Sequence, residues 1–307
     1  MEKPNSLPPE KDLPEHLYHY TSIDGLEGIL TRRFLWASEI HFLNDTQEFK
    51  YSIDVLRKVI SELRKKNPIK SIQKALGPGL LPSEQKEFLE AFYQSIEGDI
   101  LFKIFVRFPI YIFSLSERGD LLSQWRGYCP PGGGYSIGFP LKLLTKFLET
   151  RDLFLMRCIY NEKEQEAMVK RAIIETVEIS QEIFTKNFTT TRKDIKKAPS
   201  LCVLNFLKGF LNIASILKHP SFHEECEWRI ISSNLIPIQD MSFRVGKSML
   251  IPYFSISFKD IEPFLIDEII IGPTTEQGLA ENSLRQFVLQ INPNISIKTS
   301  KTPYRQL

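Results

Sequence analysis

The chain has 307 residues, of which 42% are hydrophobic and 25% charged, a composition typical of a globular protein and not of a disordered or fibrous one. Its 39 Lys and Arg and 37 Asp and Glu leave a net charge of +2, so no overall field attracts it to nucleic acid or anionic lipid. The 4 cysteines stand singly, without a CxxC pair. This pattern argues against a zinc site or a disulfide framework and favours a reducing cytoplasm.

The first fifteen residues carry four prolines and no apolar leader, which predicts a flexible lead-in to a cytoplasmic protein. The longest apolar runs are far shorter than a bilayer-spanning helix, so we expect no membrane insertion. Alternating apolar positions predict short strands at 16–20, 33–38, 110–116, 135–139, 155–160, 227–232, 248–254, 268–272 and 296–299. Apolar residues at intervals of three and four predict helices at 47–65, 84–106, 161–217 (interrupted at 189–199) and 274–289, with a further helix after Ser22.

Strands from both ends of the chain, with helices between them, indicate an α+β protein. We expect a lead-in over 1–15 and a single α+β domain over 16–307, built on one mixed-sheet core. Helical insertions are predicted near 47–106 and 161–218, and no clean linker separates a second domain.

A first polar segment lies at the predicted end of the first strand, His19-Tyr20-Thr21-Ser22. Polar side chains beside the free N–H groups of a helix start suit a ligand with phosphates or an amide. The alternative is that Thr21 or Ser22 only caps the helix while the two rings pack.

A second segment follows the strand at 110–116. Ser116 ends that strand, and Gln124, Trp125, Arg126 and Tyr128 follow in a loop or a single helical turn. Arg126 presents a planar fork of donors that suits phosphate or carboxylate. A purely structural role for these residues is an equal alternative.

The third segment is His223-Glu224-Glu225-Cys226-Glu227-Trp228-Arg229. If it is extended, Glu225, Glu227 and Arg229 share one face. Two carboxylates so placed repel each other, which favours an acid held at a cleft over a plain core strand. The alternative is a solvated strand edge. No HExxH or GxSxG pattern supports a zinc protease or an α/β-hydrolase.

Taken in order, these segments resemble a bacterial family of uncharacterised proteins known only as a domain of unknown function. The resemblance rests on HYTS, LWAS with FLND, FSLSE, SQWRGY, GGYSIGF, EExEWRII and a terminal PYR. This pattern in turn resembles the ADP-ribosyltransferase superfamily: a first strand with a histidine, then a helix, central aromatic residues and a late strand led by a glutamate. The resemblance implies the fold of that superfamily and NAD as substrate, without a metal.

For NAD binding, the resemblance implies that His19 holds the ribose and that the backbone at Tyr20 clamps the nicotinamide amide, with Thr21 beside it. Trp125 or Tyr128 would stack on nicotinamide.

In the same pocket Ser116 and Gln124 would contact NAD, and Arg126 would pair with its pyrophosphate. Glu227 would be the catalytic glutamate, and Glu225 the acid that orients or deprotonates the acceptor.

Two functions remain open at this stage. The first is an ADP-ribosyltransferase-like enzyme that cleaves NAD and modifies a protein or nucleic-acid acceptor, in anti-phage defence or as a toxin with a partner or antitoxin protein. Simple NAD hydrolysis is a close variant. The second is a non-catalytic nucleotide- or nucleic-acid-binding module that uses basic helical faces, formed by Arg57, Lys58, Arg64, Lys65, Lys66, Arg192, Lys193, Lys196 and Lys197. A metal-dependent phosphodiester hydrolase would need clustered acids and histidines, and these are dispersed.

Overall fold

The computed structural model describes residues 13–42, 46–65, 82–97, 109–129, 133–151, 153–187, 198–232, 236, 238–246 and 248–303. Most of the predicted lead-in, residues 98–106 of a predicted helix and most of the polar stretch at 189–199 lie outside these ranges. The chain divides into two compact units. The described residues of a helical unit fall within 43–109 and 159–220, and those of a sheet unit within 6–42, 110–158 and 221–307.

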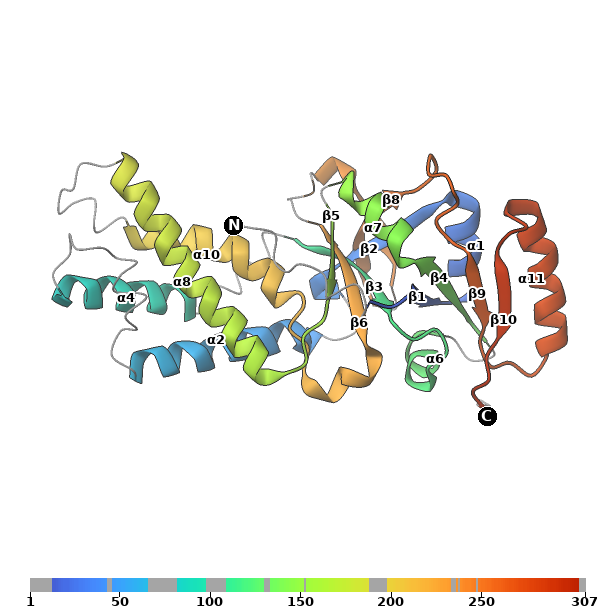
Figure 1. Cartoon of the computed structure of the whole chain (residues 1–307), viewed down its shortest axis with the longest axis horizontal. Helices are drawn as coiled ribbons and strands as arrows, with labels where there is room; N and C mark the ends of the chain where they lie inside the picture. Colours follow the sequence, from blue (N-terminus) through green and yellow to red (C-terminus); the bar gives the residue numbers. More distant parts are fainter. Residues whose placement is uncertain are drawn as a thin grey trace. The chain divides into compact units, whose positions relative to one another are not determined.

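The sheet unit alternates short strands with short helices (Figure 1). Its strands are β1 (His16–Thr21), β2 (Phe34–Glu39), β3 (Tyr111–Ser116), β4 (Tyr135–Pro140), β5 (Leu153–Arg157), β6 (Glu227–Ser232), β7 (Met241–Val245), β8 (Leu250–Ser257), β9 (Glu268–Ile271) and β10 (Ser296–Thr299). Its helices are α1 (Ile23–Arg32), α6 (Leu122–Tyr128), α7 (Leu141–Glu149) and α11 (Gln277–Ile291), with 3₁₀ turns η2 (Ile40–Phe42), η3 (Pro220–Glu225) and η4 (Ile238–Asp240).

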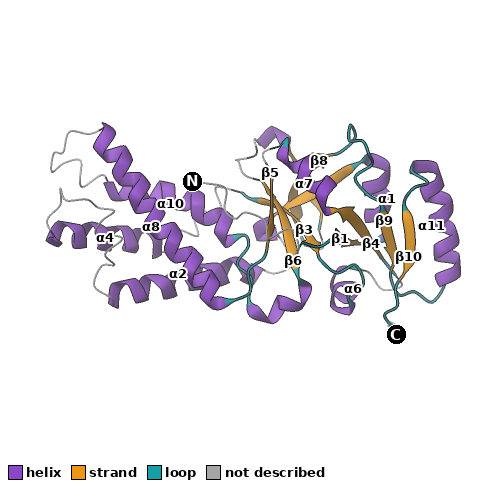
Figure 2. Cartoon of the chain, in the orientation of Figure 1, coloured by secondary structure: helices purple, strands orange, loops and turns teal. Residues whose placement is uncertain are grey.

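The ten described strands form one mixed sheet (Figure 2) in the order β10-β9-β4-β1-β3-β2-β8-β7, with β6 between β3 and β5. Only β9 and β10 pair in parallel; the other described pairs are antiparallel. The α+β class is therefore confirmed. The expectation that β1, β3, β4 and β6 share one sheet core is confirmed as well.

The sheet forks at β3. One edge of β3 pairs with β6 over residues 112–116. The other edge is divided: β2 pairs at its start, through Ser38 with Ile112, and β1 at its end, through Tyr18 with Ser116. Because β1 and β2 diverge between these points, the backbone of Ser114 has no strand partner on this edge.

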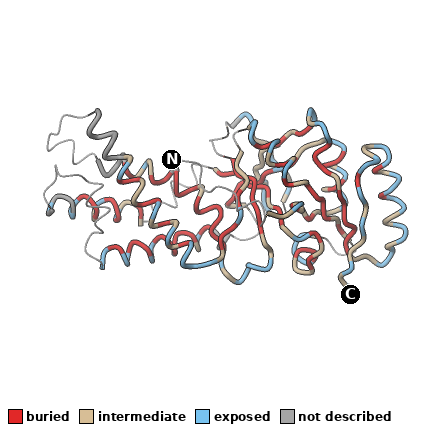
Figure 3. Tube along the Cα trace, in the orientation of Figure 1, coloured by how far each residue is buried: buried red, intermediate tan, exposed pale blue. Residues whose placement is uncertain are grey.

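A large hydrophobic cluster forms the main core of the sheet unit, whose strands are largely buried (Figure 3). Helices α1, α7 and α11 contribute their apolar faces to it, with Leu26, Ile29 and Leu30 from α1, Leu141, Leu144, Phe147 and Leu148 from α7, and Leu284 and Val288 from α11. Burial of each such side chain stabilises the fold by about 1.5–3 kcal/mol. Neither α7 nor β7 was predicted, because Pro140 gives α7 no side-chain cap and β7 has only five residues.

The helical unit contains α2 (Thr46–Lys65), α4 (Pro82–Glu97), α8 (Glu162–Asn187) and α10 (Ala198–Ala214). Two cationic side chains of α2 contact acidic partners on other helices: Arg64 contacts Glu90 at 3.0 Å and Glu97 at 2.5 Å, and Lys58 contacts Glu166 at 2.5 Å. Within the described ranges, no helix is both long and apolar enough to cross a bilayer. The other basic residues of the second hypothesis that lie outside the described residues are Lys66, Arg192, Lys193, Lys196 and Lys197.

Candidate functional site

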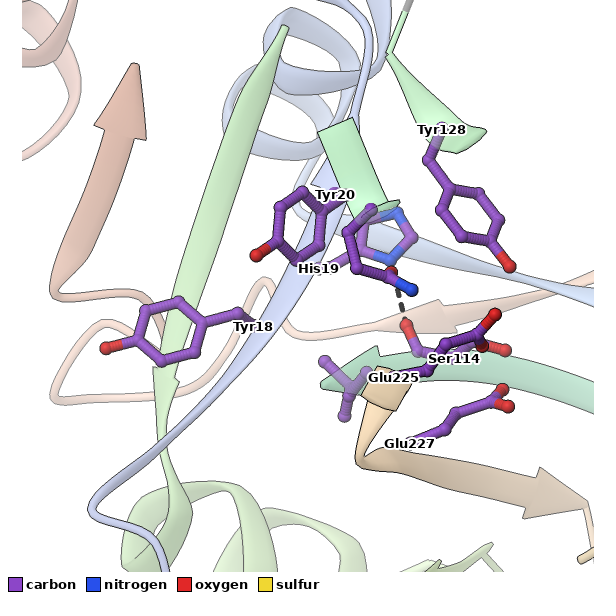
Figure 4. A pocket seen from close by; sticks show the side chains of 9 residues that line it. Tyr18, His19, Tyr20, Ser114, Tyr128, Glu225 and Glu227 are labelled. Carbon is purple, nitrogen blue, oxygen red and sulfur yellow. Dashed lines mark hydrogen bonds between the residues drawn. The ribbon is translucent and has the colours of Figure 1, made fainter. Parts of the chain in front are cut away.

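A pocket that opens to solvent lies at the fork of the sheet (Figure 4). Its walls come from β1, β3, α6 and the junction of η3 with β6, through Tyr18, His19, Tyr20, Ser114, Leu115, Gln124, Tyr128, Glu225 and Glu227. More than two hundred positions separate the first of these residues from the last. Six of the ten residues proposed as site residues line it.

His19 lies against the part of the β3 edge that pairs with neither β1 nor β2, at Ser114. Its ring stacks on Phe113 with centroids 4.2 Å apart, and Nδ1 lies 3.0 Å from the carbonyl oxygen of Ser114. A carbonyl can only accept, so Nδ1 carries the proton and Nε2 is an acceptor. Burial lowers the pKa of His19 to about 4, although the bond to Ser114 acts in the opposite direction. At neutral pH the pocket therefore has an uncharged imidazole that can accept a hydrogen bond from a ligand hydroxyl.

The end of β1 is fixed by the chain itself. The Tyr20 hydroxyl donates to the carbonyl of Arg118 at 2.6 Å and accepts from the amide of Leu121 at 2.9 Å. Ser22 caps α1 by accepting from the Gly25 amide at 3.1 Å, which was the structural alternative for this segment. Thr21 does not line the pocket; its side chain packs so closely on Gly25 that an added Cβ would lie 1.9 Å from its hydroxyl.

The segment after β3 is a seven-residue helix, α6, and not a loop. Gln124 and Tyr128 are four residues apart, so they share the face that lines the pocket. Trp125 is buried, packs edge-on against Tyr20 and donates to Asp120 at 2.7 Å. Arg126 is exposed and does not line the pocket. Of the two aromatic residues considered for stacking, only Tyr128 is a lining residue.

Glu225 and Glu227 approach the pocket from different elements. Glu225 ends η3, and Glu227 begins β6. Between them Cys226 has φ of 44°, in the left-handed region. The condition under which Glu225, Glu227 and Arg229 would share one strand face is therefore not met for Glu225, because the strand begins at Glu227. The turn nevertheless leaves both carboxylates at the pocket, where they point to the same side (Figure 4).

Ser116 supports this turn without lining the pocket. It is buried, donates to the carbonyl of Glu225 at 2.7 Å and accepts from the Arg118 amide at 3.1 Å. The amide of Glu117 donates to the carbonyl of Cys226 at 3.1 Å. Ser116, the last residue of β3, and Glu117, which follows it, thus hold the backbone on either side of Cys226.

Glu227 is held by Arg229. The guanidinium Nε donates to Oε1 at 2.8 Å and Nη2 to Oε2 at 2.9 Å, and both side chains are buried. Two parallel charge-assisted bonds fix the carboxylate plane. An ionised carboxylate has about four acceptor positions, and this ion pair uses two of them. The geometry gives a rigid negative charge at the pocket wall.

Sequence reasoning did not anticipate the contribution of Ser114 or Tyr18. Ser114 acts through its backbone carbonyl, which no side-chain pattern reports. Tyr18 precedes His19 on β1, and its hydroxyl donates to Glu268 at 3.1 Å. Alternation along β1 assigns its side chain to the face opposite His19, and its ring points away from His19 and the two glutamates (Figure 4).

A family model described as a protein of unknown function, DUF2971, matches residues 124–230. This span runs from α6 into β6 and includes four pocket residues, Gln124, Tyr128, Glu225 and Glu227. No curated protein and no solved structure matches the chain significantly. The match supports a relationship with an uncharacterised protein family and assigns no activity.

Proposed function

We propose that the protein is an ADP-ribosyltransferase-like enzyme that cleaves NAD between nicotinamide and ribose and transfers ADP-ribose to a protein or nucleic-acid acceptor. The observation that carries the proposal is the meeting of a first-strand histidine, His19, and a late-strand glutamate, Glu227, at one pocket. They belong to β1 and β6, which flank β3. Such an activity suits an anti-phage factor or a toxin restrained by a partner protein.

The pocket chemistry suits this reaction. When the bond between ribose and nicotinamide breaks, its electron pair leaves with nicotinamide and the ribose carbon acquires oxocarbenium character. The Glu227 carboxylate, fixed by Arg229, would accept a hydrogen bond from a ribose hydroxyl and stabilise the positive charge. A preorganised group of this kind typically contributes about 3 kcal/mol to transition-state stabilisation. The Nε2 atom of neutral His19 would accept a hydrogen bond from a second ribose hydroxyl.

The second half of the reaction needs an acceptor whose nucleophile attacks the same carbon. Glu225 would take the proton from that nucleophile as the new bond forms. If the nucleophile is water, the products are ADP-ribose and nicotinamide, which is the hydrolytic variant. Tyr128, exposed at the pocket, would stack on the nicotinamide ring.

The pocket would take one end of the dinucleotide, nicotinamide and its ribose, beside His19, Tyr128 and Glu227. The pyrophosphate would extend outside, toward the exposed end of α6 that carries Arg126. The non-catalytic alternative used the basic face of α2, where the described cations Arg64 and Lys58 already pair with acids.

The test is incubation with NAD that carries a label in its adenylate half, with nicotinamide release and acceptor labelling measured separately. Glu227→Gln should lower nicotinamide release by about a hundredfold or more. Glu225→Gln should lower labelling more than release. Glu224→Gln, an exposed neighbour on η3, is the matched control and should leave both unchanged. Full release by Glu227→Gln would refute the proposal, as would the absence of release by the wild-type protein with protein, RNA and DNA acceptors.

A further inference from the structure

A group of aromatic rings lies on the β2–β8–β7 branch of the fork, where Trp36 is exposed and Phe34 and Tyr253 are half-buried. The Trp36 side chain is 41% exposed, and its ring lies 4.6 Å from that of Tyr253, centroid to centroid, at an angle of 31°. Phe34 lies two residues before Trp36 on the same side of β2, and the Lys259 ammonium sits 4.7 Å from its ring centroid. Large rings on an open sheet surface need a reason beyond packing.

This surface belongs to the same side of the sheet as part of the pocket wall. Tyr253 pairs with Ser38, and Ser38 pairs with Ile112, and directly paired residues project to one face. Ser114 lies two residues beyond Ile112 and therefore shares that face. Continuing the β2–β3 register by two residues would bring Trp36 level with Ser114, across the gap of the fork.

The surface is cationic. Arg244 of β7 reaches across to donate to the Ser38 hydroxyl at 3.3 Å, and Lys259 caps Phe34. Among the described residues that β2, β8 and β7 direct to this face, none is acidic. They are Phe34, Trp36, Ser38, Ile251, Tyr253, Ser255, Ser257, Ser242 and Arg244. We call Phe34, Trp36, Tyr253, Arg244 and Lys259 the aromatic face.

We propose that the aromatic face binds single-stranded nucleic acid. Exposed rings on a sheet stack with unpaired bases, and neighbouring Arg and Lys side chains neutralise phosphates. A duplex hides the faces of its bases, so it cannot use these rings in the same way. The bound strand could also serve as the acceptor if one of its nucleotides reaches the pocket; this part rests on the function proposed above. The binding of the strand to the aromatic face does not depend on that function.

Trp36 supplies a direct reporter of such binding. The chain has 3 tryptophans, and Trp125 and Trp228 are buried at 2% and 1% exposure. Titration with twelve-nucleotide oligo(dT) and oligo(U), without NAD, should quench the fluorescence in a saturable way. Affinity should fall as salt rises, and comparison of the two oligomers distinguishes DNA from RNA. Fluorescence anisotropy of end-labelled oligomer gives the affinity of variants that lack the tryptophan.

Trp36→Ala should weaken binding about tenfold or more, in the range for one stacked base. Trp36→Phe should keep most of the affinity and lose the quenching, which also controls for misfolding. Phe243→Ala is the matched control: Phe243 is 58% exposed on the opposite face of β7 and its loss should change nothing.

The proposal fails if neither oligomer binds, if Phe243→Ala weakens binding as much as Trp36→Ala, or if polyglutamate competes as well as the oligomers do. Polyglutamate competition would indicate a surface for an acidic protein instead. Oligomer binding without nicotinamide release would refute the proposed function and leave this inference standing. Nicotinamide release without oligomer binding would refute this inference and leave the proposed function standing.

Discussion

Removing one partner of the buried Glu227–Arg229 pair should cost more stability than removing both. The pair is bidentate, with bonds of 2.8 and 2.9 Å, and the residues are only 5% and 2% exposed. Arg229→Met leaves a buried carboxylate and Glu227→Leu leaves a buried guanidinium. The double variant replaces both charges with apolar groups of similar volume.

The expected magnitudes follow from this burial. Loss of one partner of a buried ion pair costs about 3–5 kcal/mol, whereas apolar replacement of the whole pair is often nearly neutral. The two single variants should therefore each lose about 3–5 kcal/mol, and the double variant should lose far less than their sum. The coupling free energy should exceed about 2 kcal/mol. Glu227→Gln also removes the carboxylate that pairs with Arg229, which should lower the free energy of unfolding by about 1–3 kcal/mol. The activity of this variant must therefore be measured under conditions in which the variant stays folded.

Urea unfolding followed by tryptophan fluorescence measures these changes in the right part of the chain, because Trp36, Trp125 and Trp228 all belong to the sheet unit. Glu281 and Arg285 on α11 form an exposed pair at 2.6 Å and serve as the control. Its coupling should be only about 0.2–1 kcal/mol. Additive losses at Glu227 and Arg229, or a loss from Arg229→Met no larger than from Arg285→Met, would refute the reasoning.

Two further predictions concern β1 and α1. The pKa of His19 is lowered from 6.5 to about 4. Between these two pH values, His19 therefore binds a proton in the unfolded chain but not in the folded chain. Stability should fall as the pH drops from 6.5 toward 4, by up to about 3 kcal/mol, and His19→Gln should flatten this part of the urea-midpoint profile; parallel profiles would contradict it. Gly25→Ala should destabilise α1 by about 1–3 kcal/mol because of the contact with Thr21, whereas Gly28→Ala, with no atom within 4 Å of its added Cβ, should stabilise it by about 0.5–1 kcal/mol. Thermal melting of both glycine variants checks this, and a stabilising Gly25→Ala would mean that Thr21 does not pack there.

The sheet core could be predicted from sequence because its strands carry a strong local signal. β3 is apolar at most positions and β6 contains Trp228, Ile230 and Ile231, so both could be recognised as core strands from composition and alternation. His19 and Glu227 were found for the same reason, since each stands where an apolar strand meets polar residues. Their convergence on one pocket depends on β3 pairing with both flanking strands, which single-strand patterns do not encode.

What sequence reasoning missed depends on backbone geometry. Seven residues are too few to show helical periodicity, so the sequence predicts only a loop or one turn at α6 and does not reveal the face that Gln124 and Tyr128 share. Arg126 was chosen for its chemistry, but the helix directs it away from the lining. No sequence pattern predicts the fork, because its characteristic hydrogen bond joins the His19 ring to the backbone carbonyl of Ser114. Only tertiary pairing reveals which carbonyl lacks a strand partner.

The turn at Cys226 shows how such geometry can be tested. For a residue other than glycine, the left-handed region costs roughly 1–2 kcal/mol. Cys226 adopts this conformation, with φ of 44°. Hydrogen bonds from Ser116 and Glu117 hold the backbone around it. Cys226→Gly should therefore be as stable as the wild type or up to about 1 kcal/mol more stable. Cys226→Val should lose about 1–2 kcal/mol, because a β-branched residue fits this conformation poorly. Urea midpoints give the stabilities, and nicotinamide release measured below both midpoints should fall in the valine variant, where Glu225 and Glu227 lose their alignment. Equal midpoints for the two variants would mean that the backbone at this position is extended and that the carboxylates approach the pocket along one strand.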